Sequence, residues 1–308
     1  MPAQNQNQGI TVIVPTLNRG SFLLDTLNDL LAQDHRPLEI LVVDQSNASD
    51  AALLEVVRRN SDLIAYHRVT FRGLPLARNY GWQHAKYEAI VFVDDDIRCA
   101  PSLLSEHLRG LLRPKVGMVA GGVEEALPAG RKNRDTETGQ FHWWTATPIR
   151  SFAAHGEFMV QHVAGCNFSA WRKVLQQAGG FDEALAMGAA LYEETELCLR
   201  VRRCGCEILF NGKARVRHLT ASSGGCRVRD LPKYMRSLAH NRSLLIGRHL
   251  PWFRRPVACL RLLLLFVSYA WHYKTVSVFR WFPRALIAGF RTAASAPVCT
   301  NYTSEART

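Results

Sequence analysis

The stretch AIVFVDDD at residues 89–96 decides the fold of this chain. Its first five residues are all apolar, as expected of a β-strand covered on both faces, and three aspartates follow directly. Two runs of the same kind precede it, ITVIVP at 10–15 and LEILVVD at 38–44, and each ends in a polar loop. Helical apolar patterns separate these runs. Repeated strand–helix units of this kind predict an α/β fold with a parallel sheet and right-handed crossovers.

Length and charge narrow the class of protein further. The 308 residues suffice for about two ordinary domains, or for one large α/β domain with an appendage. With 47% hydrophobic and 21% charged residues, a disordered or fibrous chain is excluded. The net charge is +12, but residues 227–308 hold 14 basic and 2 acidic residues, so the rest of the chain is nearly neutral. A basic tail therefore follows a neutral body.

The amino terminus does not suggest secretion, and the cysteines do not suggest a zinc site. Residues 1–9 lack the basic and apolar regions of a secretory signal, which predicts a cytoplasmic protein. The eight cysteines show no C-x-x-C spacing.

The carboxylates at strand ends are the first candidate site. In a parallel sheet, ligands bind beyond the carboxyl ends of the strands, where Asp44 and residues 94–96 fall. Adjacent carboxylates raise one another's pKa unless a cation neutralises them. Because side chains alternate along an extended segment, Asp94 and Asp96 can point the same way while Asp95 points elsewhere. Oxygen ligands favour Mg²⁺ or Mn²⁺. The alternative is a solvated acidic turn in which Asp96 begins the next helix.

Seven motifs in order resemble the inverting glycosyltransferases of family 2, which have the GT-A fold. The motifs are VIVPTLNR at 12–19, LVVDQSNASD at 41–50, GLPLARNYG at 73–81, VFVDDD at 91–96, GCN at 165–167, GGFDE at 179–183 and EETELCLR at 193–200. The resemblance covers roughly residues 10–223. It implies a mixed sheet flanked by helices in a catalytic domain at 1–223. Its nucleotide-sugar half would span about 10–115 and its acceptor half 116–223, and a basic helical region would occupy 224–308.

The resemblance also assigns roles to single residues. The substrate-binding and nucleotide-binding positions that it implies are Pro15, Thr16, Asp44, Arg78, Asp94, Asp95, Asn167 and Glu193. Within this set, Thr16 and Asp44 would hold the nucleotide base and Arg78 would approach the nucleotide. Asp94 and Asp96 would contact the ribose and the metal ion on the diphosphate. The alternatives are a loop-stabilising role for Asp44 and a salt bridge to a core carboxylate for Arg78.

The general base and a late metal ligand follow from the same comparison. In the family, the general base is the aspartate of an E-D pair at the start of a helix, and the register here puts Glu194 at that position. This glutamate is one methylene longer than aspartate, so Glu193 and Glu196 stay alternatives, as does a simple interaction of these acids with the helix dipole. His218 follows a strand-like segment and is a candidate metal ligand. A structural histidine is the alternative.

The basic tail suggests a membrane surface. In residues 279–291 the arginines Arg280, Arg284 and Arg291 share one helical face, opposite an apolar stripe of Phe279, Phe282, Leu286 and Phe290. A basic amphipathic helix of this kind suits the inner face of an anionic membrane. In the alternative, these helices pack on the catalytic domain or on a second subunit.

These features together predict a metal-dependent inverting glycosyltransferase of the hexosyltransferase type, with Mg²⁺ or Mn²⁺ as cofactor. It would move a sugar from a nucleotide-diphosphate donor to a glycan or lipid-linked acceptor in cell-surface polysaccharide biosynthesis. Acceptor choice is expected to depend on loops such as 127–140. A nucleic-acid-associated protein using the basic tail is the alternative from the binding class, and an inactive glycosyltransferase relative is another. A dinucleotide-dependent dehydrogenase is disfavoured because no G-x-G-x-x-G follows the first strand.

Overall fold

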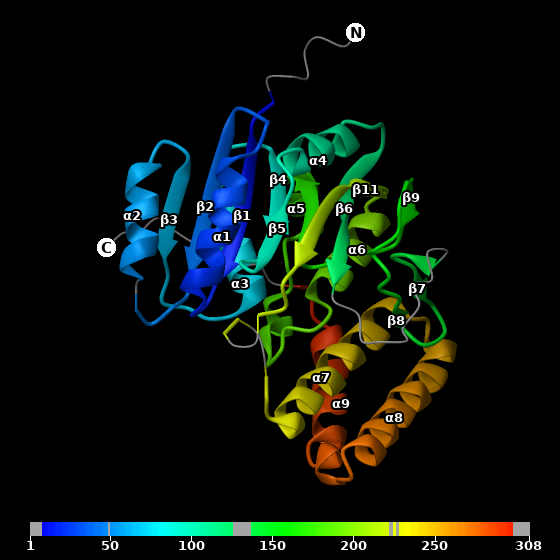
Figure 1. Ribbon diagram of the computed structural model, residues 1–308. Helices are drawn as coiled ribbons and strands as arrows, with labels where there is room; N and C mark the ends of the chain where they lie inside the picture. The colour runs from blue at the N-terminus through cyan, green and yellow to red at the C-terminus, as the bar shows by residue number, and fades with distance from the viewer. Residues whose placement is uncertain (1–7, 49, 126–136, 222–223, 226–227, 298–308) are drawn as a thin grey trace.

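A nine-stranded mixed sheet forms the centre of the computed structural model, which describes residues 8–48, 50–125, 137–221, 224–225 and 228–297 (Figure 1). Residues 126–136 of the predicted acceptor loop lie outside the described part. The strands are β1 (Ile10–Thr16), β2 (Leu38–Asp44), β3 (Ile64–Arg68), β4 (Ala89–Val93), β5 (Ile97–Cys99), β6 (Val116–Glu125), β9 (Glu157–Val160), β10 (Asn167–Trp171) and β11 (Glu207–His218), with β7 (Phe141–His142) and β8 (Thr147–Pro148) in a separate hairpin.

The first half of the sheet is parallel, as the strand–helix repeat predicts. Its order is β3-β2-β1-β4, and the strands are buried runs of apolar residues. In the register of β1 and β2, Thr16 lies opposite Asp44. The polar residues at the carboxyl ends of these strands therefore meet at one edge of the sheet.

The second half of the sheet mixes directions, which confirms the mixed GT-A-type sheet rather than a wholly parallel one. Strand β10 runs antiparallel to both β4 and β6, whereas β11 is parallel to β6. The short strand β5 pairs antiparallel with β11, and β9 also pairs with β11. Because β5 begins at Ile97, the three aspartates lead into a strand and not into the helix that the acidic-turn alternative supposed.

Helices cover the sheet, and one cluster of buried apolar side chains joins them to it. The helices of this part are α1 (Gly20–Leu31), α2 (Ala51–Arg59), α3 (Leu74–His84), α4 (Leu103–Leu111), α5 (Arg172–Ala178) and α6 (Glu193–Arg203), with a short 3-10 helix η2 at Glu183–Ala186.

The C-terminal region is helical, as predicted, and lies beyond the edge at which the strands end (Figure 1). It comprises α7 (Leu231–His249), α8 (Arg255–His272) and α9 (Phe282–Ala293), with 3-10 turns η3 (Trp252–Arg254) and η4 (Ser277–Phe279). A second core unites these helices with Phe141 and Ala146 of the hairpin segment and Leu199 of α6. The helical region is thus packed onto the body, while the division at residues 223 and 224 stays a prediction.

The apolar stripe predicted for the last helix faces inward. Its members, Phe279, Phe282, Leu286 and Phe290, pack against the second core, and the arginines of the opposite face are exposed. The packing alternative therefore describes α9. None of the helices in the described part of the chain has the length and hydropathy of a membrane span.

Candidate active site

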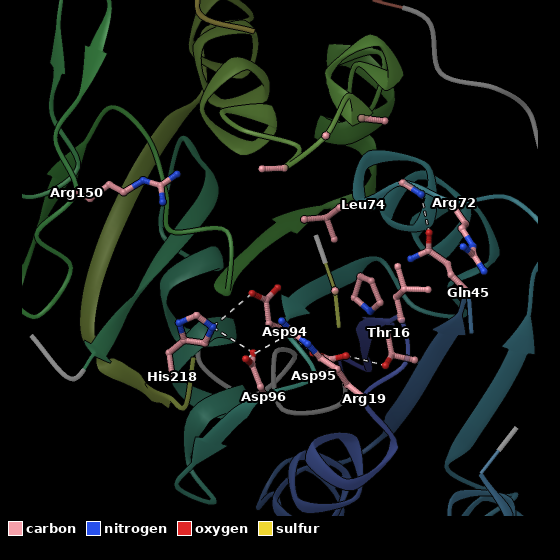
Figure 2. A pocket seen from close by; sticks show the side chains of 17 residues that line it. Thr16, Arg19, Gln45, Arg72, Leu74, Asp94, Asp95, Asp96, Arg150 and His218 are labelled. Atoms are coloured by element: carbon pink, nitrogen blue, oxygen red, sulfur yellow. Dashed lines mark hydrogen bonds and ion pairs between the residues drawn. The ribbon is translucent and has the colours of Figure 1, made fainter. Parts of the chain in front are cut away.

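A cavity of about 490 Å³ opens where β1, β4 and β11 end (Figure 2). Pro15, Thr16 and Arg19 line it from the loop after β1, and the three aspartates line it from the segment after β4. His218 comes from the end of β11, and residues 186–189 close another side through Ala186, Gly188 and Ala189. The cavity therefore lies at the edge where the sequence places the ligand site.

Asp94, Asp96 and His218 form a cluster with the donor atoms of a metal site. Antiparallel pairing of β11 with β5 sets His218 opposite Ile97, next to Asp96. The His218 Nε2 atom lies 3.1 Å from Asp96 Oδ1 and 3.8 Å from Asp94 Oδ2, and one ligand atom of each residue lies within 4.8 Å of the others. Two carboxylate oxygens and one imidazole nitrogen form a donor set that suits Mn²⁺, and Mg²⁺ through the oxygens. The residues present therefore fit a divalent cation.

The surroundings of the cluster shift its pKa values in opposite directions. Burial raises the pKa of Asp94, and the nearby charges of Arg78 and His218 only partly oppose it. Burial also acts to raise the pKa of Asp96, but hydrogen bonds from the His218 ring and from the Ala221 backbone N–H outweigh it and lower the pKa. Asp96 is thus held as a carboxylate.

Asp95 points away from His218 and ties the aspartates to the first loop (Figure 2). Its Oδ2 accepts a hydrogen bond from the Thr16 hydroxyl at 2.7 Å, and its Oδ1 accepts one from Arg19 at 2.8 Å. Arg19 also lies 3.3 Å from Asp96. Burial raises the pKa of Asp95 to about 6, against the opposing effect of Arg19.

A smaller cavity of about 290 Å³ adjoins the first at Thr16, which lines both. Asp44, Ser46 and Asp50 also line it. Asp44 is 2% exposed, and its Oδ1 accepts a hydrogen bond from the Ser46 backbone N–H at 2.8 Å while its Oδ2 accepts one from the Tyr66 hydroxyl. Asp44 and Thr16, which the family resemblance assigns to the nucleotide base, thus line the same cavity.

Arg78 lies behind the cavity and not in its wall. Its guanidinium is 1% exposed and donates to Glu193 and, at 2.7 Å, to the Gly165 carbonyl. It also lies 3.5 Å from Asp94 Oδ1. This is the salt-bridge arrangement that the sequence left open as an alternative. Burial raises the pKa of Glu193 against the opposing charge of Arg78, and no described residue forms a hydrogen bond to Glu193 Oε2.

Glu194 is buried at the start of α6 beside the same group. A Cβ added at Gly165 would lie 3.7 Å from the Glu194 carboxyl carbon. The Glu194 Oε1 atom accepts a hydrogen bond at 3.0 Å from Arg150, whose side chain is 62% exposed and lines the cavity. Glu194 itself does not line the cavity but contacts Arg150, which does.

Glu196 and Asn167 are held in the interior by other partners. The Glu196 carboxylate contacts Arg200 at 2.7 Å, Arg248 at 2.9 Å and His249 at 3.2 Å. Asn167 donates to the carbonyls of Gly122 and Ala214 and pairs with His107 of α4, so both ends of its amide have partners between the sheet and this helix. Neither residue lines the cavity.

Sequence reasoning assigned no role to several residues that line the larger cavity. They are Arg19, Gln45, Arg72, Arg150 and the segment 186–189. Gln45 accepts a hydrogen bond from the Gly73 backbone N–H at 2.7 Å, which fixes the loop before α3. Arg19 and Gln45 fall inside two of the quoted motifs, which was the one available signal. The others come from loops that only the fold brings together.

Solved structures of similar fold include glycosyltransferases with bound nucleotide and metal. A mannosyltransferase from Pyrobaculum calidifontis, solved with GDP-Man and Mn²⁺, gives a TM-score of 0.54 at 18% identity and covers 92% of this chain and 86% of its own. GalNAc-T7, solved with UDP, GalNAc and Mn²⁺, gives a TM-score of 0.61 at 18% identity, with 95% of this chain and 58% of its own covered. These likenesses show the GT-A fold.

Sequence comparisons give the family. A curated relative, glucosyl-dolichyl phosphate glucuronosyltransferase from Haloferax volcanii, is 24% identical over 216 residues, which are 68% of each chain. The model of the family "Glycosyl transferase family 2" matches residues 11–178, more than half of the chain. Taken with the cluster of acids and histidine at the strand ends, this match shows that the protein is a glycosyltransferase and belongs to glycosyl transferase family 2.

Proposed function

We propose that this protein is a metal-dependent, inverting hexosyltransferase that moves a sugar from a nucleotide-diphosphate donor to a hydroxyl group of a glycan or lipid-linked acceptor. The catalytic domain would comprise residues 1–223. The observation that carries the proposal is the cluster of Asp94, Asp96 and His218 in the wall of the larger cavity.

The two adjoining cavities suit the two ends of such a donor. Asp94, Asp96 and His218 would hold Mn²⁺ or Mg²⁺, which would neutralise the negative charge that develops on the departing diphosphate. The nucleotide base would enter the smaller cavity, where the buried carboxylate of Asp44 can accept a hydrogen bond from a ring N–H. Uracil, thymine and guanine carry such a group.

The acceptor would react from the side of α6. Its hydroxyl group attacks the anomeric carbon as the bond from that carbon to the diphosphate oxygen breaks, and the hydroxyl proton passes to a carboxylate oxygen of Glu194. A single displacement on the face opposite the leaving group inverts the anomeric configuration. Arg150 contacts Glu194 and lines the cavity, so Arg150 would lie beside an acceptor that reaches Glu194.

Glu193 and Arg78 would position these groups. Arg78 bonds Glu193 of α6 and lies beside Asp94, so one buried guanidinium connects the helix that carries the base to a ligand of the metal site. We assign both residues to positioning and not to contact with substrate. Asp95 has the same kind of role toward Thr16 and Arg19.

The acceptor class is supported by the names of relatives. The Haloferax volcanii relative is named for a dolichyl-phosphate-linked sugar. A poly-β-1,6-N-acetyl-D-glucosamine synthase from Staphylococcus aureus matches 37% of this chain at 30% identity. We therefore propose a role in cell-surface polysaccharide biosynthesis, at the inner face of the membrane, where a lipid-linked acceptor would be presented.

Ligand-induced thermal stabilisation tests the donor class. The purified chain would be heated with UDP, GDP, dTDP, CDP or ADP, each with and without Mn²⁺, because specific binding raises the melting temperature by mass action. We expect one nucleotide diphosphate with a ring N–H to raise it in a Mn²⁺-dependent way. An absence of any shift across the panel would contradict the proposal.

A further inference from the structure

Helix α8 carries an exposed apolar stripe on the side facing away from the protein. Val257, Leu260, Leu264, Val267 and Trp271 follow one another at steps of three and four residues, the spacing of one helical face. Leu260 is 57% exposed, Leu264 51% and Trp271 87%. These five residues are called the α8 stripe below.

The opposite face of α8 is already used. Ala258, Leu262 and Phe266 are buried in the second core, where the Phe266 ring lies 4.5 Å from that of Phe282. Because this face fixes the helix to the rest of the C-terminal region, the α8 stripe has no described partner within the chain. Figure 1 shows α8 running along the outer edge of the helical region. Soluble monomers rarely expose a continuous apolar surface of this kind without a binding role.

The charge around the stripe identifies the partner. Residues 231–297 contain 11 basic residues and no acidic residue; Arg242 is buried and Arg248 is paired with Asp182 and Glu196, and the other nine are at least partly exposed. Two copies of this surface would bring like charges together, whereas an anionic lipid surface is complementary to it. Indole rings stand near both ends of α8, with Trp252 79% exposed and Trp271 87% exposed. Tryptophan side chains favour the boundary between lipid headgroups and acyl chains.

From the α8 stripe and the basic surface around it, we propose that α8 is a membrane-docking helix. It lies in the plane of the interface, inserts the α8 stripe between the headgroups of an anionic bilayer, and keeps the basic side chains at headgroup level. The surface differs from the one predicted from sequence, because the stripe of α9 is buried. The inference rests on the proposed function in one respect, because a lipid-linked acceptor would give the protein a reason to bind a membrane. Docking itself needs no catalysis.

Vesicle sedimentation of the full chain tests this surface. We expect the protein to pellet with vesicles of phosphatidylcholine and 30% phosphatidylglycerol, to bind pure phosphatidylcholine at least ~10-fold more weakly, and to be released by high salt. The double variant Leu260→Ser/Leu264→Ser should weaken anionic vesicle binding at least ~10-fold. The control is Leu54→Ser/Met159→Ser, which removes two exposed apolar side chains elsewhere (41% and 50% exposed) and should bind like the wild type.

Two further readouts keep the result unambiguous. Tryptophan fluorescence of the wild type should shift to shorter wavelength on adding anionic vesicles, which tests the proposal even if the double variant fails to fold. The proposal would be overturned if the wild type did not bind anionic vesicles, or if a folded double variant bound them normally. The proposal would also be overturned if the wild type formed a dimer and the double variant were monomeric but still bound lipid normally. Nucleotide-induced stabilisation measured without vesicles reports separately on the proposed function.

Discussion

Replacing Glu196 by glutamine should lower the free energy of unfolding by about 3 kcal/mol. The carboxylate is fully buried and contacts Arg200, Arg248 and His249. Removing one member of a buried ion pair costs roughly 3 to 5 kcal/mol, because its partner charges stay buried. The lower end applies because Arg200 still bonds the Gly180 carbonyl and Arg248 still bonds Asp182. At roughly 2 °C per kcal/mol, the melting temperature should fall by about 6 °C.

Glu194→Gln is the matched control, since it makes the same change two residues earlier in the same helix. Glu194 is buried as well, but its one described hydrogen-bond partner, Arg150, is largely exposed and stays hydrated when the bond is lost, so the free energy of unfolding should fall by less than it does in Glu196→Gln. The transfer rate of Glu194→Gln should fall by about 10² to 10⁴ because the proposed general base is lost. Denaturant unfolding and transfer assays at 25 °C separate the two effects. The reasoning fails if Glu196→Gln is as stable as the wild type, or if it abolishes transfer while folded.

Three further predictions concern the buried interior and the proposed site of the nucleotide base. Burial would raise the pKa of Glu196, but Arg200 and His249 hold it far below the ordinary value of about 4.3, so its stabilisation is complete above that pH and is lost as pH falls further. The difference in melting temperature between wild type and Glu196→Gln should therefore narrow below about pH 4.3. Asn167→Ala leaves the carbonyls of Gly122 and Ala214 without their donor and should cost about 1 to 3 kcal/mol in denaturant unfolding; an unchanged midpoint would contradict this. Asp44→Asn should weaken nucleotide binding at least ~10-fold by calorimetry, whereas Asp50→Asn, in the same cavity but capping α2, should leave it unchanged; equal effects would argue against a base contact.

Local patterns predicted the first half of the fold because each strand there is a continuous apolar run ending in polar residues. Alternation along the segment after β4 likewise predicted that Asp94 and Asp96 face one side and Asp95 the other, as Figure 2 shows. The position of His218 depends on the pairing of β11 with β5, two segments more than 100 residues apart. Only the family resemblance supplied that residue.

Long-range packing decided what local patterns left open. Arg78 is compatible with both a nucleotide contact and a buried salt bridge, and in the structure it pairs with Glu193, which lies 115 residues further along the chain. Arg150 reaches the cavity from a segment without a motif. In the C-terminal region, α8 and α9 both carry apolar stripes, and sequence periodicity does not say which stripe is covered. The packing of Phe282 and Phe266 against each other buries the stripe of α9 and leaves that of α8 outside.

Calorimetric titration of the nucleotide diphosphate selected by thermal stabilisation, with and without Mn²⁺, tests the metal site most directly. The wild type should bind the nucleotide at least ~10-fold more tightly with Mn²⁺, since in the proposal the cation would be held by Asp94, Asp96 and His218 and would attract the diphosphate. His218→Ala should bind with a smaller dependence on Mn²⁺, and Asp96→Ala should lose that dependence. Equal affinity with and without Mn²⁺ in the wild type, unchanged in both variants, would contradict the account.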